Sequence, residues 1–326
     1  IWLLGNTIWN AEDIDAIKNH QDTVFYNNNT LIGANLDHKA GQGWIKSGGP
    51  VNNDLISENG KNELKTNVIE YLWDAVALTN EQIEKDLQFF LGYTLPETDA
   101  ELINSENILV HSSVQIGQGA VVDASQGSVI IANDTVVKPL SYLAGPLYLG
   151  EHCMVEPMTQ IKGGCSIGPV CNLGGEINSV IIQGWSNKVH DGHLGDAYLG
   201  QWVNLGAGTV NSNLKNNYSD VDVMVNGVMT NTSLKHVGCF VGDHVKTAIG
   251  TRLNTGTVIG TGSNIVMNGF PPKTISPFSW CVGNKVKPFR WEAFLETAEI
   301  VKSHRNMKIS AADKMLLESI YRRKKT

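Results

Sequence analysis

The feature of this chain that most restricts its fold is a repeat of six residues. Apolar residues occupy every sixth position, without a break, in the middle of the sequence; they are Ile131, Val137, Leu143, Leu149, Val155, Ile161, Ile167 and Leu173. The same spacing links Ile108 to Val114 and Leu199 to Leu205, and it returns between Val241 and Ile265 with Thr247 in one position. A period of six fits neither an α-helix nor a simple alternating strand.

This period is typical of a parallel β-helix with three short, flat faces. One apolar side chain per hexapeptide points inward, about 18 residues complete a coil, and successive coils stack about 4.8 Å apart. Small residues after the inward position allow tight corners, as in Ile167-Gly168 and Leu173-Gly174. Chance alternation in an ordinary β-sandwich would not maintain the period over so many repeats. The sequence therefore predicts a mainly β solenoid whose coils bury one another.

The regions on either side of the repeat have different patterns. Before it, we expect strands over 1–4, 23–26 and 30–34 and helices over 11–18, 68–78 and 81–91. After it, an apolar stripe predicts a helix over 290–305, and Ser310 followed by Asp313 indicates a capping box before a helix over 311–323. The predicted organisation is a partial α/β domain over 1–106, a β-helix over 107–284 and a helical extension over 285–326.

Composition excludes several classes of protein. The chain has 326 residues, of which 42% are hydrophobic, so a large buried core is expected rather than disorder. A net charge of -7 argues against a general nucleic-acid binder. No apolar run is long enough for a transmembrane helix, and five cysteines without a CxxC spacing favour free thiols over disulfides or a zinc site. We expect a cytoplasmic protein with neither nucleic-acid nor membrane partners.

The densest polar stretch runs from Ser186 to Asn217 and includes His190, His193, Asn204 and Asn213. A coil interior requires apolar residues, so these side chains are expected outside the coil or in a loop. Histidine can accept a proton near neutral pH. Asparagine amides and glycine-exposed N–H groups suit sugar hydroxyls and an oxyanion, and lysines suit phosphate as point charges. The stretch therefore predicts a site for a polar, anionic substrate.

The residues of this stretch resemble a known family. The runs Gly-Asp-Ala-Tyr-Leu-Gly at 195–200 and Val-Asn-Leu-Gly-Ala-Gly-Thr at 203–209 are similar to the acetyltransferase half of the bacterial bifunctional N-acetylglucosamine-1-phosphate uridylyltransferase/glucosamine-1-phosphate acetyltransferase. Nearly the whole chain more closely resembles the alternate, Bacteroidetes-type form of that enzyme. Further matching segments are Trp73-Asp74, 174–178, 186–190, 212–217, 254–258 and 277–280. The resemblance implies a left-handed β-helix and a homotrimer with active sites between subunits.

The resemblance also implies a reaction and a set of site residues. The reaction is acetyl transfer from acetyl-CoA to the amine of glucosamine-1-phosphate or a similar amino-sugar phosphate, in UDP-N-acetylglucosamine synthesis, without a metal. His190 matches the family's general base, and the Ala207 amide matches the group at the thioester oxygen. The expected substrate-binding residues are Lys162, Glu176, Lys188, His193, Asn204, Asn213 and Lys215, and the expected cofactor-binding residues are Ala207, Lys246 and Thr261.

Some positions depart from the family pattern. His193 stands where the family has tyrosine, Lys162 where it has arginine, and Asp243 where it has a small polar residue. Glu176 aligns with a family position only across a gap, and Lys215 is the nearest candidate for a phosphate-binding lysine. These departures bear on the acceptor more than on the reaction type.

Other functions remain open. The first part of the chain resembles the later part of a nucleotidyltransferase-like domain whose opening segment is missing, which agrees with a chain that starts at Ile1. Leu4-Gly5-Asn6 stands where the family has the Gly-Asp that binds Mg²⁺, and asparagine is the poorer ligand. Mg²⁺ would be needed only for nucleotidyl transfer.

Two further alternatives are a β-helical carbonic anhydrase and a non-catalytic sugar-nucleotide-binding protein. The first would require zinc held by three histidines, and the spacing of His190, His193, His236 and His244 does not reproduce that pattern. The second would bind ligand without turnover. Structural roles are also open for His193, His236 and His244.

Overall fold

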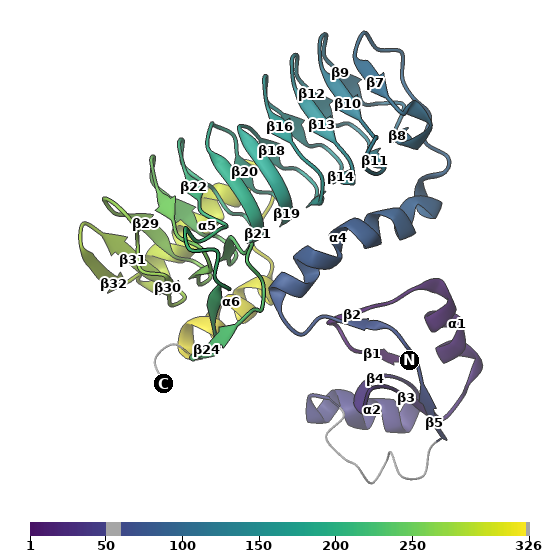
Figure 1. Cartoon of the computed structure of the whole chain (residues 1–326). Helices are drawn as coiled ribbons and strands as arrows, with labels where there is room; N and C mark the ends of the chain where they lie inside the picture. Colours follow the sequence, from purple (N-terminus) through teal and green to yellow (C-terminus); the bar gives the residue numbers. More distant parts are fainter. Residues whose placement is uncertain (50–59, 324–326) are drawn as a thin grey trace. The chain divides into compact units, whose positions relative to one another are not determined.

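The computed structural model describes residues 1–49 and 60–323, and it separates into two compact units, Ile1–Asp74 and a second unit that begins at Ala75 (Figure 1).

The first unit is built on a four-stranded sheet in the order β1-β4-β3-β5. Its elements are β1 (Trp2–Leu3), β2 (Thr7–Ile8), α1 (Ala11–Asn19), β3 (Thr23–Asn27), β4 (Thr30–Asn35), α2 (His38–Ser47), β5 (Gly60–Glu63) and β6 (Asn67–Val68), with β2 paired to β6. Alternate residues of β3 face opposite sides, so Phe25 packs with Ile17 of α1 while Val24 packs with Trp44 of α2. The first strands and α1 were predicted, whereas α2 was missed because Gly41 and Gly43 weaken its helical signal.

One helix, not two, follows this sheet. α4 runs from Leu72 to Asp86 and continues into the 3₁₀ turn η1 (Leu87–Phe90), so the predicted break between 78 and 81 is wrong. Asp74 accepts hydrogen bonds from the N–H of Tyr71 (2.8 Å) and Glu70 (3.2 Å) near the start of α4. Farther along, Glu84 accepts from the N–H and hydroxyl of Ser128, which fixes α4 against the coils.

The second unit contains the predicted parallel β-helix, whose coils run from Glu101 to Val282. The first face comprises β7 (Glu101–Ile103), β10 (Val121–Asp123), β13 (Tyr142–Ala144), β16 (Gln160–Ile161), the starts of β19 (Glu176–Gly184) and β21 (His193–Gln201), β22 (Val210–Asn211) and β27 (Arg252–Leu253). The second comprises β8 (Ile108–Val110), β11 (Val129–Ile131), β14 (Leu147–Leu149), β17 (Cys165–Ile167), the ends of β19 and β21, β25 (Cys239–Val241), β28 (Thr257–Ile259) and β30 (Thr274–Ile275). The third comprises β9 (Gln115–Ile116), β12 (Val136–Val137), β15 (Met154–Val155), β18 (Asn172–Leu173), β20 (Asn187–Lys188), β26 (Lys246–Thr247), β29 (Asn264–Val266) and β31 (Ser279–Val282), which pairs with β32 (Lys285–Pro288).

The hexapeptide period marks the coil interior. All eight residues of the unbroken run are buried, none of them more than 1% exposed. Tyr142 pairs in parallel with Gln160, 18 residues later, as three hexapeptides per coil require. The mainly β fold class is therefore confirmed.

Two irregularities interrupt the regular coils. Asn172 pairs with Asn187, only 15 residues later, so one coil is shortened beside the polar stretch. An insertion between Asn211 and Cys239 leaves the solenoid and forms the hairpin β23 (Asp222–Val225) and β24 (Val228–Asn231).

The C-terminal helices α5 (Trp291–Ser303) and α6 (Ala311–Arg323) pack on the last coils through Phe278, Phe294 and Leu317. The predicted capping box is present, since Asp313 N–H donates to Ser310 Oγ (3.0 Å) and Ser310 N–H donates to Asp313 Oδ2 (3.3 Å).

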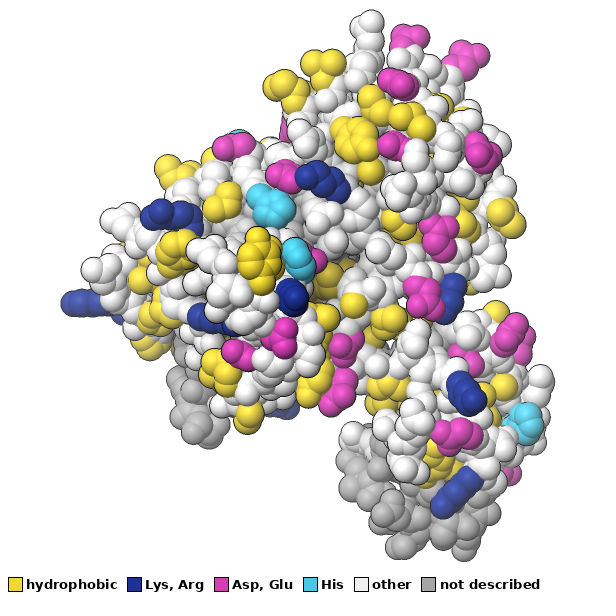
Figure 2. Space-filling model, in the orientation of Figure 1, with side chains coloured by type: hydrophobic (Ala, Val, Ile, Leu, Met, Phe, Trp, Pro, Cys, Tyr) yellow, Lys and Arg dark blue, Asp and Glu magenta, His cyan; other side chains and the backbone are white. Residues whose placement is uncertain are grey.

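The surface and the cysteines match the composition. All five cysteines are free and buried. Basic and acidic side chains are interspersed on the face drawn in Figure 2. Within residues 1–49 and 60–323, no helix is long and apolar enough to cross a bilayer.

Candidate functional site

Three of the predicted substrate-binding residues meet on the first face of the solenoid. Glu176 and His193 are paired across β19 and β21, and His193 Nδ1 lies 3.5 Å from Glu176 Oε2. Lys162, one coil earlier, places its Nζ 2.5 Å from the other carboxylate oxygen. The hydrogen bond from Lys162 lowers the pKa of Glu176, and the charge of His193 acts in the same direction. We call Lys162, Glu176 and His193 the Glu176 face.

A buried carboxylate lies at the corner that follows this face. Asn213 Nδ2 donates to Asp196 Oδ2 (2.5 Å), and burial raises the pKa of Asp196 while Asn213, His236 and His193 oppose that rise. Gly195 leaves the room for this arrangement, because a Cβ there would lie 2.6 Å from His193 Nε2 and 3.0 Å from Asn213 Nδ2. Asp196 and His236 were not predicted as site residues, although Asp196 belongs to the Gly-Asp-Ala run.

His190 and Ala207 occupy the same corner of neighbouring coils, and we call this pair the His190 corner. Asn187 forms a parallel bridge with Asn204, and His190 and Ala207 each follow three residues later. The register therefore places them one coil apart, which is about 4.8 Å along the axis. His190 is exposed. A base and a backbone amide at this separation can serve two atoms of one reacting group.

Lys188, expected to bind substrate, points into the solenoid instead. It is 2% exposed and occupies the inward position of β20, next to Leu173 of the preceding coil. Its Nζ donates to the carbonyls of Gly174 (3.1 Å), His190 (2.5 Å) and Asp191 (3.2 Å), and burial lowers its pKa to about 8. All three N–H donors are thus used inside the shortened coil, which gives Lys188 a structural role at the His190 corner.

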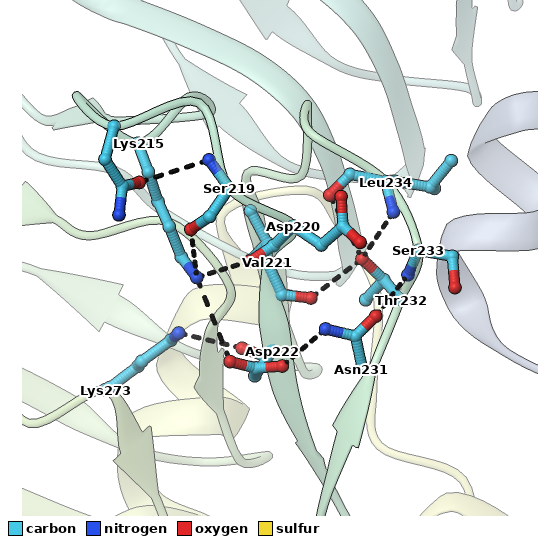
Figure 3. A network of polar contacts seen from close by, with 11 residues as sticks. Lys215, Ser219, Asp220, Val221, Asp222, Asn231, Thr232, Ser233, Leu234 and Lys273 are labelled. Atoms are coloured by element: carbon cyan, nitrogen blue, oxygen red, sulfur yellow. Dashed lines mark hydrogen bonds and ion pairs between the residues drawn. The ribbon is translucent and has the colours of Figure 1, made fainter.

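Lys215 is held within the insertion (Figure 3). Its Nζ donates to the Asp220 carbonyl, approaches Ser219 Oγ at 3.4 Å and lies 3.8 Å from Asp222 Oδ2. Lys273 approaches the same residue from the solenoid and donates to the Asp222 carbonyl (2.8 Å). Burial, followed by the charge of Lys215, lowers the pKa of Lys273. Lys215 therefore braces the insertion in this structure.

Asn204 and Lys246 lie together on the third face, in a cleft beside α5. Asn204 Oδ1 accepts from Asn187 Nδ2 (3.2 Å). Lys246 Nζ donates to the Trp202 carbonyl (2.6 Å), and burial lowers its pKa to about 8.

Thr261 lies at a different corner, where a Cβ on Gly242 would come within 2.8 Å of its hydroxyl. The predicted residues of one chain thus fall into separate groups on different sides of the coil. No group of three or more histidine, cysteine or carboxylate side chains that could hold a metal ion occurs within the described parts of the chain.

Comparison with known proteins shows distant relatives. No family model matches the chain. It is 24% identical over 257 residues to the "Bifunctional protein GlmU" of Thermotoga petrophila, covering 68% of this chain and 49% of that protein. It is 31% identical over 143 residues to a "Bifunctional sugar-1-phosphate nucleotidylyltransferase/acetyltransferase" of Sulfurisphaera tokodaii, covering 43% and 35%. The chain spans about half the length of the first of these relatives.

Among solved structures, an Arabidopsis UDP-N-acetylglucosamine acyltransferase matches 65% of this chain and 80% of its own, with 14% identity and a TM-score of 0.29. The sequence relatives carry the assignment. The chain has a hexapeptide-repeat β-helix and is a distant relative of the bifunctional GlmU proteins.

Proposed function

We propose that this protein transfers an acetyl group from acetyl-CoA to the amine of glucosamine-1-phosphate or a similar amino-sugar phosphate. The observation that carries the proposal is the His190 corner, where an exposed imidazole and the Ala207 amide lie one coil apart. The Glu176 face follows directly along the chain. The names of the relatives support transferase chemistry on a phosphorylated sugar.

In the proposed reaction, the neutral amine attacks the thioester carbonyl carbon. His190 accepts the proton that the nitrogen loses as the new C–N bond forms. The Ala207 N–H stabilises the negative charge on the carbonyl oxygen. When the C–S bond breaks, the sulfur of CoA takes up the proton from His190, which restores the base. No metal takes part in this sequence.

The remaining predicted residues serve binding in this proposal. Lys162 would meet the phosphate and His193 the sugar, with Glu176 positioning both side chains, since it already contacts each of them. Asn213 would hold the amino sugar. Asn204, Lys246 and Thr261 lie on other sides of the same chain, so their participation requires the proposed homotrimer, in which neighbouring subunits would complete each site. The product would enter UDP-N-acetylglucosamine synthesis.

The test is thiol release from acetyl-CoA with glucosamine-1-phosphate as acceptor, without metal. His190→Ala is expected to lower the rate by about 10²-fold or more, as for a lost general base. His152→Ala is the matched control, because His152 is also an exposed coil histidine but lies outside the His190 corner. A His190→Ala rate close to that of His152→Ala would refute the assignment of the base.

Two runner-up functions give different results in the same assay. A sugar-nucleotide-binding protein would bind ligand without releasing thiol. Sugar-1-phosphate nucleotidyl transfer would require Mg²⁺ and a nucleoside triphosphate, and it would be unaffected by His190→Ala.

A further inference from the structure

A cleft of about 350 Å³ lies between the third face of the solenoid and the C-terminal end of α5. Trp185, Trp202, Asn187 and Asn204 contribute its coil side. The two indoles stack with ring centroids 5.6 Å apart and an interplanar angle of 11°. The cleft therefore has an aromatic wall and two amide side chains that can donate and accept hydrogen bonds.

The charged groups of this cleft all have the same sign. Lys246 comes from the coil, and His304 and Arg305 come from α5 and the turn after it, whereas no carboxylate lines the cleft. This contrasts with the net charge of -7 of the whole chain. Cations gathered away from water without a counter-charge are unfavourable unless an anion joins them.

The donors in the cleft are only partly used. Arg305 Nη2 donates to Asn187 Oδ1 (3.2 Å), which leaves most of the five N–H groups of a guanidinium for another acceptor. Lys246 Nζ donates to one carbonyl, of Trp202, and an ammonium has three N–H groups. Both cations are thus held in place by neutral partners.

A neighbouring lysine shows that these cations are not needed to dock the helix. Lys302 lies one turn before Arg305, and its Nζ is 2.9 Å from Asp313 Oδ2 and 5.1 Å from the Trp202 ring centroid. The contact that fastens α5 to the aromatic stack therefore carries its own carboxylate. The cleft beside it does not, so its charge is available to a ligand.

From this combination we propose that the cleft binds a nucleoside phosphate. Lys246 and Arg305 hold the phosphate, and the base packs against the tryptophan wall with its edge toward Asn187 and Asn204. A volume of about 350 Å³ lies within the usual range for small-ligand sites. This site is separate from the His190 corner and does not depend on the proposed acetyl transfer.

Two sources carry this chemistry: a free nucleotide, and the nucleotide end of a coenzyme. Titration calorimetry on the whole protein, without acetyl donor or acceptor, tests the site itself. AMP and UMP are expected to bind. Ribose 5-phosphate should bind about 10-fold more weakly, since it lacks the base that the indoles would contact.

Variants locate the binding. Arg305→Gln and Lys246→Met should each weaken AMP binding by about 10-fold or more, as for a lost charge-assisted contact to phosphate. Arg290→Gln is the matched control, because it removes the same charge from the other end of α5, outside the cleft. A thermal melt of each variant shows whether the fold is intact.

The outcomes are distinct. The proposal is overturned if well-folded protein does not bind AMP or UMP at millimolar concentration, if both cleft variants bind as Arg290→Gln does, or if ribose 5-phosphate binds as tightly as AMP. If CoA displaces AMP and Arg305→Gln raises the KM for acetyl-CoA, the nucleotide belongs to a coenzyme; if neither occurs, it is a free nucleotide. Failure of thiol release would contradict the acetyl-transfer proposal and leave these binding results unaffected.

Discussion

The Glu176 face and the α5 cleft are carried by the same few coils, yet they handle charge in opposite ways. On the Glu176 face, Lys162 and His193 share one carboxylate. In the cleft, Lys246 and Arg305 have only neutral oxygen partners. Both faces start from the same strand, since Asn187 lines the cleft and His190 follows three residues later.

The difference indicates how each region would receive an anion. A ligand phosphate that reaches Lys162 has to compete with Glu176, so binding there exchanges one ion pair for another. A phosphate in the cleft supplies a counter-charge that the described residues lining it do not provide. Exposed pairs contribute about 0–1 kcal/mol, whereas charges withdrawn from water cost more. The cleft is therefore expected to depend more strongly on its ligand.

The largest expected effect comes from Gly174→Ala, which disturbs the His190 corner from inside the coil. A Cβ on Gly174 would lie 1.7 Å from the Val189 carbonyl oxygen, so the corner must move. We expect a loss of about 3 kcal/mol in the free energy of unfolding, as for severe overpacking. Urea unfolding measures it.

Gly92→Ala is the control for this substitution, because no heavy atom lies within 4 Å of a Cβ placed there. Equal stability of the two alanine variants would show that the corner adapts freely, and the shortened coil would then not fix the position of His190.

The shortened coil also shows what sequence reasoning could and could not reach. The inward positions were predictable because burial repeats with the hexapeptide, and the alignment of His190 with Ala207 follows from local spacing. Lys188 was misjudged because a lysine in an inward position depends on a coil of 15 residues, and that length is set by strand register. The cleft was missed because Arg305 and Asn187 are 118 residues apart in the chain.

The second effect concerns pH and the helix that closes the cleft. His244 is stacked 6.2 Å from Trp202 and lies 5.6 Å from Phe294 of α5. Burial, with help from Lys246 and Lys302 and against Asp313, lowers its pKa to about 3. Below its ordinary value of 6.5, the unfolded chain takes up a proton that the folded chain refuses, so stability falls as the pH drops from 6.5 toward 3.

His244→Phe should remove this sensitivity on the cleft side and leave the Glu176 face unchanged. Between pH 6.5 and 5, the wild type is expected to lose about 2 kcal/mol more than the variant, since each pH unit corresponds to about 1.4 kcal/mol. Urea unfolding at several pH values measures the difference, with His152→Phe at an exposed coil position as the control. Parallel pH profiles for wild type and His244→Phe would mean that the folded state accommodates the charged imidazole.

The smallest effect is expected from Glu176→Gln, although it removes the carboxylate on which the Glu176 face is centred. The side chains of Lys162 and Glu176 are 47% and 39% exposed, so solvent screens their attraction, and the free energy of unfolding should fall by at most about 1 kcal/mol. Because Lys162 lowers the pKa of Glu176, that contribution is present above the ordinary glutamate pKa and disappears as the pH falls through the lowered value. Urea unfolding at pH 7 and at pH 3 measures both, with Glu81→Gln, which loses the similarly exposed pair with Lys85 on α4, as the matched control. A loss well above that of Glu81→Gln would mean that the repulsion between Lys162 and His193 is strong without Glu176. The Glu176 face would then resemble the cleft, as a group of cations that requires an anion, and the contrast between the two regions would no longer hold.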